Sequence, residues 1–137
     1  MNCGLIRVLG AVTEKTSLDP KIAEAVTGMG TVDITTVGRK SGEPRRLEIV
    51  FHNIGGRIYI SGQPSPRRRS WLANLDANPA FTFHLKRGVK ADLPAQARII
   101  TDEAERRTVL TSVARNWRRQ DVETMVRQSP LIEVTLK

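Results

Sequence analysis

The fold of this chain is decided by the stretch 31-TVDITTVGRKSGEPRRLEIVFHNIGGRIYIS-61, in which two turns separate three strand-like runs. Apolar and polar residues alternate over 31–37 and again over 45–53, which is the period of a strand with one buried face. Gly55 and Gly56 then turn the chain into a third run over 57–61. We therefore expect an antiparallel meander of three strands.

The first of these turns, from Gly38 to Arg46, is a strongly basic loop with four cations and two glycines. Glycine readily adopts the positive φ values that aim several backbone N–H groups at one point. The side chains of Arg39, Lys40 and Arg45 could then neutralise a phosphate held there. The loop predicts an anion-binding turn, and the alternative interpretation is a solvated hairpin tip.

The positive charge of the chain is concentrated around this loop. Residues 39–69 hold eight Lys and Arg residues against Glu43 and Glu48, a net charge of +6 out of +8 for the whole chain. A second cluster, Arg67-Arg68-Arg69, follows the third strand-like run. Concentrated charge of this kind predicts an anionic partner. A phosphorylated cofactor, an acidic lipid surface and nucleic acid all fit this prediction.

Three further strand-like runs follow the meander. Phe81, Phe83 and Leu85 alternate with polar residues, and residues 89–101 form another run in which Pro94 predicts a bulge or an edge. Residues 131–136 alternate as a last strand. Because the strands are linked as hairpins and show no βαβ rhythm, we expect a mainly β, small antiparallel barrel with peripheral helices.

Helix signals lie before, between and after the strands. Asp19-Pro20 is typical of a helix start. The stretch from Pro64 to Pro66 leaves the sheet, because proline has no N–H to donate. Asp102, with Glu105 three residues later, resembles a capping box. We expect helices over 20–27 and 68–77, and a helical segment over 102–128.

The length of 137 residues is enough for one hydrophobic core, so we expect a single domain. A lone cysteine, Cys3, excludes an internal disulfide and a cysteine-built metal site. No run approaches the ~20 apolar residues of a membrane span, so we expect a cytoplasmic protein, with weak association with a membrane surface as the alternative. The expected parts of the domain are an N-terminal helical segment (1–30), the barrel strands (31–101), the helical segment (102–128) and the final strand (131–136).

Two motifs in order, GRKSGEPR at 38–45 and WLANLDANP at 71–79, resemble the deazaflavin-dependent nitroreductase family, the split-barrel oxidoreductases that use coenzyme F420. The similarity runs over most of residues 31–105. It implies a split antiparallel β-barrel of the FMN-binding or pyridoxamine-phosphate-oxidase-like type, often a homodimer. It also implies hydride transfer from reduced deazaflavin to a small acceptor, which would be a quinone, an enone or a nitro compound.

The resemblance further implies which residues bind the coenzyme. Because the cofactor supplies the hydride, no catalytic residue is assigned to the protein itself. Ser61 falls where the family places a serine near the deazaflavin ring or the substrate, and Trp71 and Asn74 match the helix beside the coenzyme. Trp71 and Leu75 also have the spacing of core-packing residues. The positions that fall on the family's phosphate-binding loop are Arg39, Lys40, Ser41, Gly42 and Arg45.

The chain departs from the family directly after Ser61. Family members continue with a lysine and two glycines, whereas this chain continues as GQPSP over residues 62–66, so one phosphate-binding lysine is missing. The cluster Arg67-Arg68-Arg69 is the candidate for additional phosphate contacts in its place. The family's tyrosine-rich substrate pocket has no counterpart either, because Tyr59 is the only tyrosine.

Other ligands stay open at this point. A split barrel can hold FMN, haem or a fatty acid at a membrane surface instead of F420, and a basic barrel can bind nucleic acid. Aromatic residues make up only 4% of the chain, which is unfavourable for base stacking, so we expect no nucleic-acid partner. His52 and His84 stand alone on strands without a nearby acidic motif, and no metal-ligand spacing is present.

Overall fold

The alternating stretch around the basic loop forms a long hairpin. In the computed structural model, which describes residues 19–137, β2 (Met29–Val37) and β3 (Pro44–Ile54) pair antiparallel, from Met29 opposite His52 to Val37 opposite Pro44. β4 (Arg57–Ser61) returns along β3. The predicted meander is confirmed, and the basic loop is the tip that joins β2 to β3.

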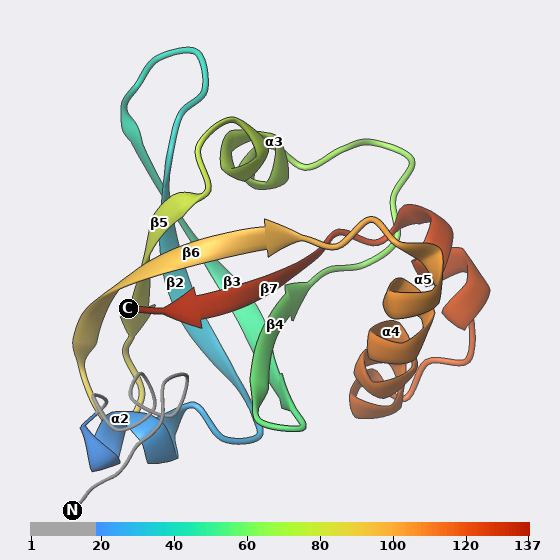
Figure 1. The fold of residues 1–137 in the computed structure, drawn as a ribbon, viewed down its shortest axis with the longest axis horizontal. Helices are drawn as coiled ribbons and strands as arrows, with labels where there is room; N and C mark the ends of the chain where they lie inside the picture. Colours follow the sequence, from blue (N-terminus) through green and yellow to red (C-terminus); the bar gives the residue numbers. More distant parts are fainter. Residues whose placement is uncertain (1–18) are drawn as a thin grey trace, which may run out of the picture.

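Three more strands close the sheet into a barrel, as Figure 1 shows: β5 (Ala80–Leu85), β6 (Ala91–Ile99) and β7 (Leu131–Leu136). The strand order around the barrel is β2-β3-β4-β7-β6-β5. Closure depends on β5, which pairs with both β2 and β6, and on β7, which pairs with both β4 and β6. All of these pairs are antiparallel, so the predicted antiparallel barrel is confirmed.

Of the bulge or edge expected at Pro94, the bulge is absent, whereas Pro94 does lie at an edge, because β6 has no strand partner there on the β7 side. Pro94 lies opposite Thr82 of β5 within an unbroken strand. On the other side, pairing with β7 begins only at the next residue, Ala95, which lies opposite Leu136. The Pro94 carbonyl still accepts a hydrogen bond from the amide of Lys137 at 2.9 Å. The proline therefore lies just outside the β6–β7 ladder, where its missing N–H is not needed.

The helices surround the barrel. In Figure 1, α2 (Pro20–Ala25) and α3 (Ser70–Ala77) lie at opposite ends of it, while α4 (Glu103–Trp117) and α5 (Val122–Gln128) lie together on one side. α3 begins two residues later than predicted, so Arg68 and Arg69 belong to the loop that precedes it. Of the N-terminal helical segment expected over 1–30, residues 1–18 lie outside the described residues, and Met29 and Gly30 already belong to β2.

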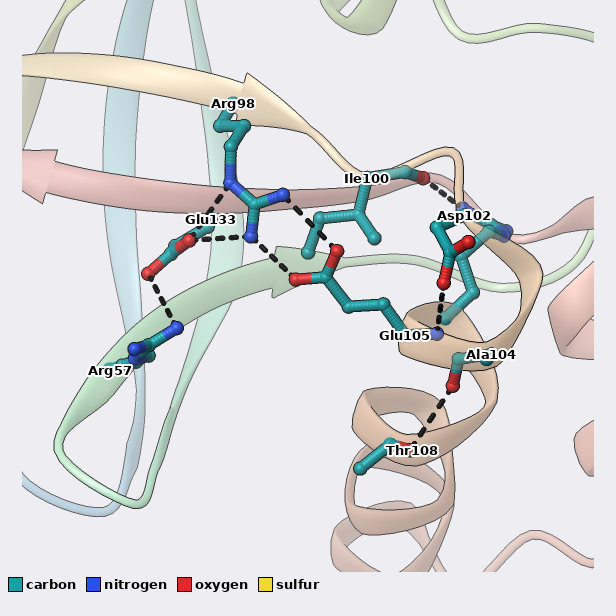
Figure 2. A network of polar contacts seen from close by, with 9 residues as sticks. Arg57, Arg98, Ile100, Asp102, Ala104, Glu105, Thr108 and Glu133 are labelled. Carbon is teal, nitrogen blue, oxygen red and sulfur yellow. Dashed lines mark hydrogen bonds and ion pairs between the residues drawn. The ribbon is translucent and has the colours of Figure 1, made fainter.

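The capping box predicted at the start of α4 is only half formed. The Asp102 side chain accepts from the Glu105 amide at 2.9 Å, as a capping residue does. Glu105 does not return the bond, because its carboxylate binds Arg98 of β6, which also binds Glu133 of β7 at 2.7 Å (Figure 2). Arg98 thereby holds the pKa of Glu105 below its usual value. The ion pair of this carboxylate with Arg98 joins α4 to β6 of the barrel, and the capping box stays incomplete.

The hydrophobic core has two parts, one inside the barrel and one beneath α4 and α5. Successive side chains of a strand point to opposite faces of the sheet. Each strand can therefore contribute to both parts of the core. In β7, Ile132 and Val134 fill the barrel, while Leu131 belongs to the outer part. The largest fully buried side chains of the barrel interior are Ile34, Ile60, Leu75, Phe83, Ile132 and Val32.

His52 lies on the outer face of β3 and is completely covered, with 0% of its surface exposed. The side-chain amide of Asn116 donates to its Nδ1 at 3.0 Å, and the ring meets that of Trp117 edge to face at 5.0 Å between centroids. The Nδ1 acceptor places the ring proton on Nε2, which has no partner among the described residues. Burial lowers the pKa of His52 from 6.5 to about 4, so the ring is neutral at pH 7.

Because His52 is buried and neutral, we expect the protein to lose stability in mild acid. The unfolded chain takes up a proton below the ordinary histidine pKa while the folded chain does not, so stability is full above pH 6.5 and falls as the pH approaches 4. We expect His52 to account for a fall of about 2 kcal/mol in the free energy of unfolding between pH 7 and pH 5.

Urea unfolding of the wild type and of His52→Phe at the two pH values checks this prediction. Phenylalanine fills the same space without titrating, so its free energy of unfolding should depend on pH less steeply by about that amount. Equal pH dependence in the two proteins would contradict the prediction.

Candidate functional site

The basic loop is a tight, internally bonded turn. The Gly38 amide donates to the Glu43 carbonyl and the Gly42 amide to the Gly38 carbonyl, both at 2.8 Å. Gly42 has a φ of +72°, which favours glycine. A Cβ on Gly38 would meet the Ser41 hydroxyl at 2.6 Å, so a side chain there would force that hydroxyl to move. Both glycines therefore favour the observed turn.

Most amides of this loop are occupied within the protein. Besides those of Gly38 and Gly42, the Glu43 amide donates to the Ser41 hydroxyl and the Arg39 amide to the Asn74 side chain, both at 3.1 Å. The expected cluster of free backbone donors is thus much reduced. Any anion bound here would depend mainly on the cationic side chains.

The four cations of the loop differ in what they bind. Arg46 forms an ion pair with Asp33 at 3.0 Å, and Arg39 donates to the Asn74 oxygen at 2.9 Å. Arg45 donates to the Ser41 hydroxyl at 3.3 Å but forms no ion pair with any of residues 19–137. Lys40 is exposed and has neither a hydrogen bond nor an ion pair of its side chain within the described part of the chain. Lys40 and Arg45 are therefore the cations available to an anionic ligand.

Asn74 of α3 holds the loop in place. The residue is 4% exposed, and its oxygen accepts from both the amide and the guanidinium of Arg39. Its side-chain nitrogen donates to the Thr36 hydroxyl, which is itself fully buried at the end of β2. These contacts use the oxygen and one of the two hydrogens on the nitrogen, so Asn74 positions the loop. Its direct contact with a cofactor stays a prediction.

A cavity of about 420 Å³ lies between the loop and α3. It brings together most of the residues expected on the phosphate-binding loop with Trp71, which is 7% exposed and also packs in the barrel core. Gly42 serves the turn and is not part of the lining. The lining residues are Thr36, Gly38, Arg39, Lys40, Ser41, Arg45, Arg46, Leu47, Ser70, Trp71 and Asn74. Sequence reasoning missed Thr36 and Leu47, which lie inside strands and carry no motif, and Ser70 at the start of α3.

The other expected site residues lie elsewhere. Ser61 is 2% exposed, and its hydroxyl donates its hydrogen to the Pro130 carbonyl at 2.7 Å. That hydrogen is therefore already used in a bond to the backbone. The cluster of Arg67, Arg68 and Arg69 lines a second, larger cavity and does not line the first. The structure thus divides the expected site residues between two cavities and leaves Ser61 in neither lining.

His84 does have an acidic neighbour, so the expectation of a lone histidine is wrong. Its Nδ1 lies 2.7 Å from the Asp92 carboxylate, and its Nε2 lies 2.6 Å from the Thr35 hydroxyl. The sequence hides this group because Asp92 comes from the next strand, where the β5–β6 register places it opposite His84. This chain of hydrogen bonds joins three strands, and its residues line neither of these two cavities.

Solved structures show the class of fold. The chain is similar to the conserved hypothetical protein Rv2991 from Mycobacterium tuberculosis, with 20% identity and a TM-score of 0.66 over 88% of this chain and 81% of that one. A candidate pyridoxamine 5'-phosphate oxidase from Listeria innocua shares 13% identity, with a TM-score of 0.59 over 91% and 94%. The F420-H2 dependent reductase FDR-A shares 23% identity, with a TM-score of 0.57 over 77% and 93%. The fold is therefore a split β-barrel of the pyridoxamine-phosphate-oxidase-like type.

The family follows from the sequence itself. The model of the F420H(2)-dependent quinone reductase family matches residues 7–136, nearly the whole chain. The chain belongs to this family and is an F420-dependent oxidoreductase, which confirms the resemblance seen in the two motifs. Among residues 19–137, no helix is both long and apolar enough to cross a membrane.

The role of Asn74 leads to a prediction that needs no ligand. In Asn74→Ala the Arg39 amide loses its acceptor and the buried Thr36 hydroxyl loses its donor. We expect the free energy of unfolding to fall by about 1–3 kcal/mol. Hydrogen exchange at the Arg39 amide should also become faster, which mass spectrometry of the 36–46 segment can measure.

Ser70→Ala is the matched control for this experiment. Ser70 lies on the same helix and lines the same cavity, but its hydroxyl makes no hydrogen bond to the described residues. Its substitution should leave exchange in the loop unchanged. Equal exchange in the two variants would show that Asn74 does not position the loop.

Proposed function

We propose that this protein transfers a hydride from reduced F420 to a small organic acceptor, a quinone, an enone or a nitro compound. We further propose that the cavity between the basic loop and α3 holds the phosphate of the coenzyme. The observation that carries the proposal is the convergence of Arg39, Lys40 and Arg45 on one cavity of about 420 Å³, on a loop that Asn74 holds in place.

The residues present fit a phosphorylated coenzyme. Lys40 and Arg45 have no carboxylate partner among residues 19–137, so binding a phosphate would not require them to give up an ion pair. Charge-assisted hydrogen bonds to phosphate are among the stronger ones in proteins. Leu47 and Trp71 add apolar surface to the same cavity. Such a mixture of a few charged groups and apolar walls is typical of cofactor sites.

The coenzyme and the protein would have different roles in the reaction. When bound, reduced F420 supplies the hydride, and the protein supplies binding, orientation and polarity. Arg39, fixed by Asn74, is a preorganised part of the cavity wall, whereas Lys40 can adjust to its ligand. His52 is buried under α4 and His84 is held between Asp92 and Thr35, so neither histidine is placed to serve as an acid or base at this cavity.

Several finer expectations stay predictions. The nature of the acceptor, a homodimer, a cytoplasmic location and weak contact with a membrane surface rest on the sequence and the resemblance. FMN, haem or a fatty acid as the ligand is the alternative to F420. A nucleic-acid partner is disfavoured, because Tyr59, Phe81 and Phe83 of the strands are all at most 6% exposed and offer no stacking surface.

Titration of the purified protein with F420, followed by tryptophan fluorescence, tests the proposal, with FMN as comparator. Trp71 lines the cavity, so binding should quench its emission. We expect Lys40→Ala and Arg45→Ala each to weaken F420 binding about tenfold or more, since each removes a charge-assisted hydrogen bond worth about 1.5–3 kcal/mol. Binding should also weaken with added salt.

Lys90→Ala is the control, because Lys90 is an exposed cation in the turn between β5 and β6 and lies outside the cavity. Its substitution removes the same charge and should leave the affinity nearly unchanged. The proposal fails if F420 does not bind at tens of micromolar. The assignment of the phosphate fails if Lys40→Ala and Lys90→Ala behave alike.

A further inference from the structure

A second cavity, of about 660 Å³, lies beside α3. The preceding section of chain, residues 65–69, and Leu72 of α3 form one wall. The end of β6, the first turns of α4 and the end of α5 form the others. The proposed coenzyme cavity instead meets α3 through Ser70, Trp71 and Asn74, so the two cavities use different residues of this helix.

The lining of this cavity combines an apolar surface with many guanidinium groups. Leu72, Ile99 and Val126 are aliphatic and half-buried or buried. Pro66 and Pro130 add further apolar surface. Two carboxylates and six arginines complete the charged part of the lining: Glu103 and Glu123, with Arg67, Arg68, Arg69, Arg106, Arg107 and Arg127.

Three of the six arginines are occupied by protein groups. Arg107 binds both lining carboxylates, Glu103 at 3.0 Å and Glu123 at 2.8 Å. Arg68 forms an ion pair with Asp76 at 2.9 Å. Arg106 donates to backbone carbonyls at the ends of β6 and α5 and so serves the structure. These three do not need a ligand.

The other three arginines give the cavity its excess positive charge. Within residues 19–137, Arg67, Arg69 and Arg127 form no ion pair, and both lining carboxylates are already used by Arg107. Arg127 has one weak contact, to the Thr124 hydroxyl at 3.4 Å. These guanidinium groups belong to two separate segments, the 65–69 loop and α5, that meet around the same cavity.

A buried hydroxyl in the lining lacks a partner as well. Ser129 is 4% exposed, and its Oγ makes no hydrogen bond to the described residues. A buried polar group without a partner is costly, and such groups are rare in folded proteins. The Ser129 Oγ is itself covered by protein atoms, so a ligand in this cavity would meet it only after a rotation of the side chain.

We propose that this cavity is a second binding site, for an amphipathic anion. The ligand is a small molecule with a carboxylate, sulfonate or phosphate head on Arg67, Arg69 and Arg127 and an apolar body against Leu72 and Val126. A cavity of this volume is in the range that encloses a molecule of drug-like size. The proposal does not depend on the proposed function, since none of these residues lines the cavity of the basic loop.

The fluorescent anion 8-anilinonaphthalene-1-sulfonate is a suitable probe, and neutral N-phenyl-1-naphthylamine is its uncharged counterpart. We expect the wild type to bind the anion about tenfold or more tightly than the neutral dye, since charge-assisted hydrogen bonds are the stronger ones. The double variant R67Q/R127Q should weaken binding of the anion by about the same factor and leave the neutral dye unaffected.

Two controls make the result decisive. R87Q/R115Q removes two exposed arginines outside the cavity and should not change binding of the anion. Lys40→Ala and saturating F420 should not change it either, because Lys40 and the proposed coenzyme cavity lie at the basic loop. The proposal is overturned if the anion does not bind, if both double variants bind it equally, if the neutral dye binds as tightly, or if F420 displaces it.

Discussion

The structure depends on the pairing of β7 with both β4 and β6. Without this strand the sheet would end in two unpaired edges, whereas a closed barrel satisfies every strand on both sides. β7 also supplies Ile132 and Val134 to the barrel interior and Leu131 to the core under α4 and α5, so one strand joins both parts of the core. The residue before it, Pro130, accepts the hydrogen bond of Ser61 and lines the larger cavity.

Once the barrel is closed, the position of α3 determines where ligands can bind. The helix lies against one end of the barrel, with Leu75 in the interior and Asn74 bonded both to Thr36 of β2 and to Arg39 of the basic loop. Ser70 and Trp71 contribute to one cavity, and Leu72 contributes to the other. A rigid helix between two basic segments therefore separates the charge that looks continuous in the sequence. It divides one basic region of the sequence between two cavities.

Local signals predicted much of the fold because they depend on neighbours in the chain. Alternation over 31–37 and 45–53 identified the meander, and the residues at 71–75 identified the helix, although Arg68 and Arg69 proved to lie outside it. Predictions that depended on a distant partner failed. The carboxylate of Glu105 binds Arg98 of β6 and does not complete the capping box. His84 lies beside Asp92, which comes from the neighbouring strand.

The sequence by itself determined the strand and helix pattern, the concentration of positive charge and, through two motifs, the family with its F420 chemistry. Only the tertiary structure decided which cations share a cavity and which are already neutralised. Arg46 is paired with Asp33 while Lys40 is free of any described partner, although both belong to the same nine-residue loop. The reason is physical: hydrogen bonds and ion pairs depend on distances of a few ångströms between side chains, and pairing across strands and helices sets those distances, independently of spacing along the chain.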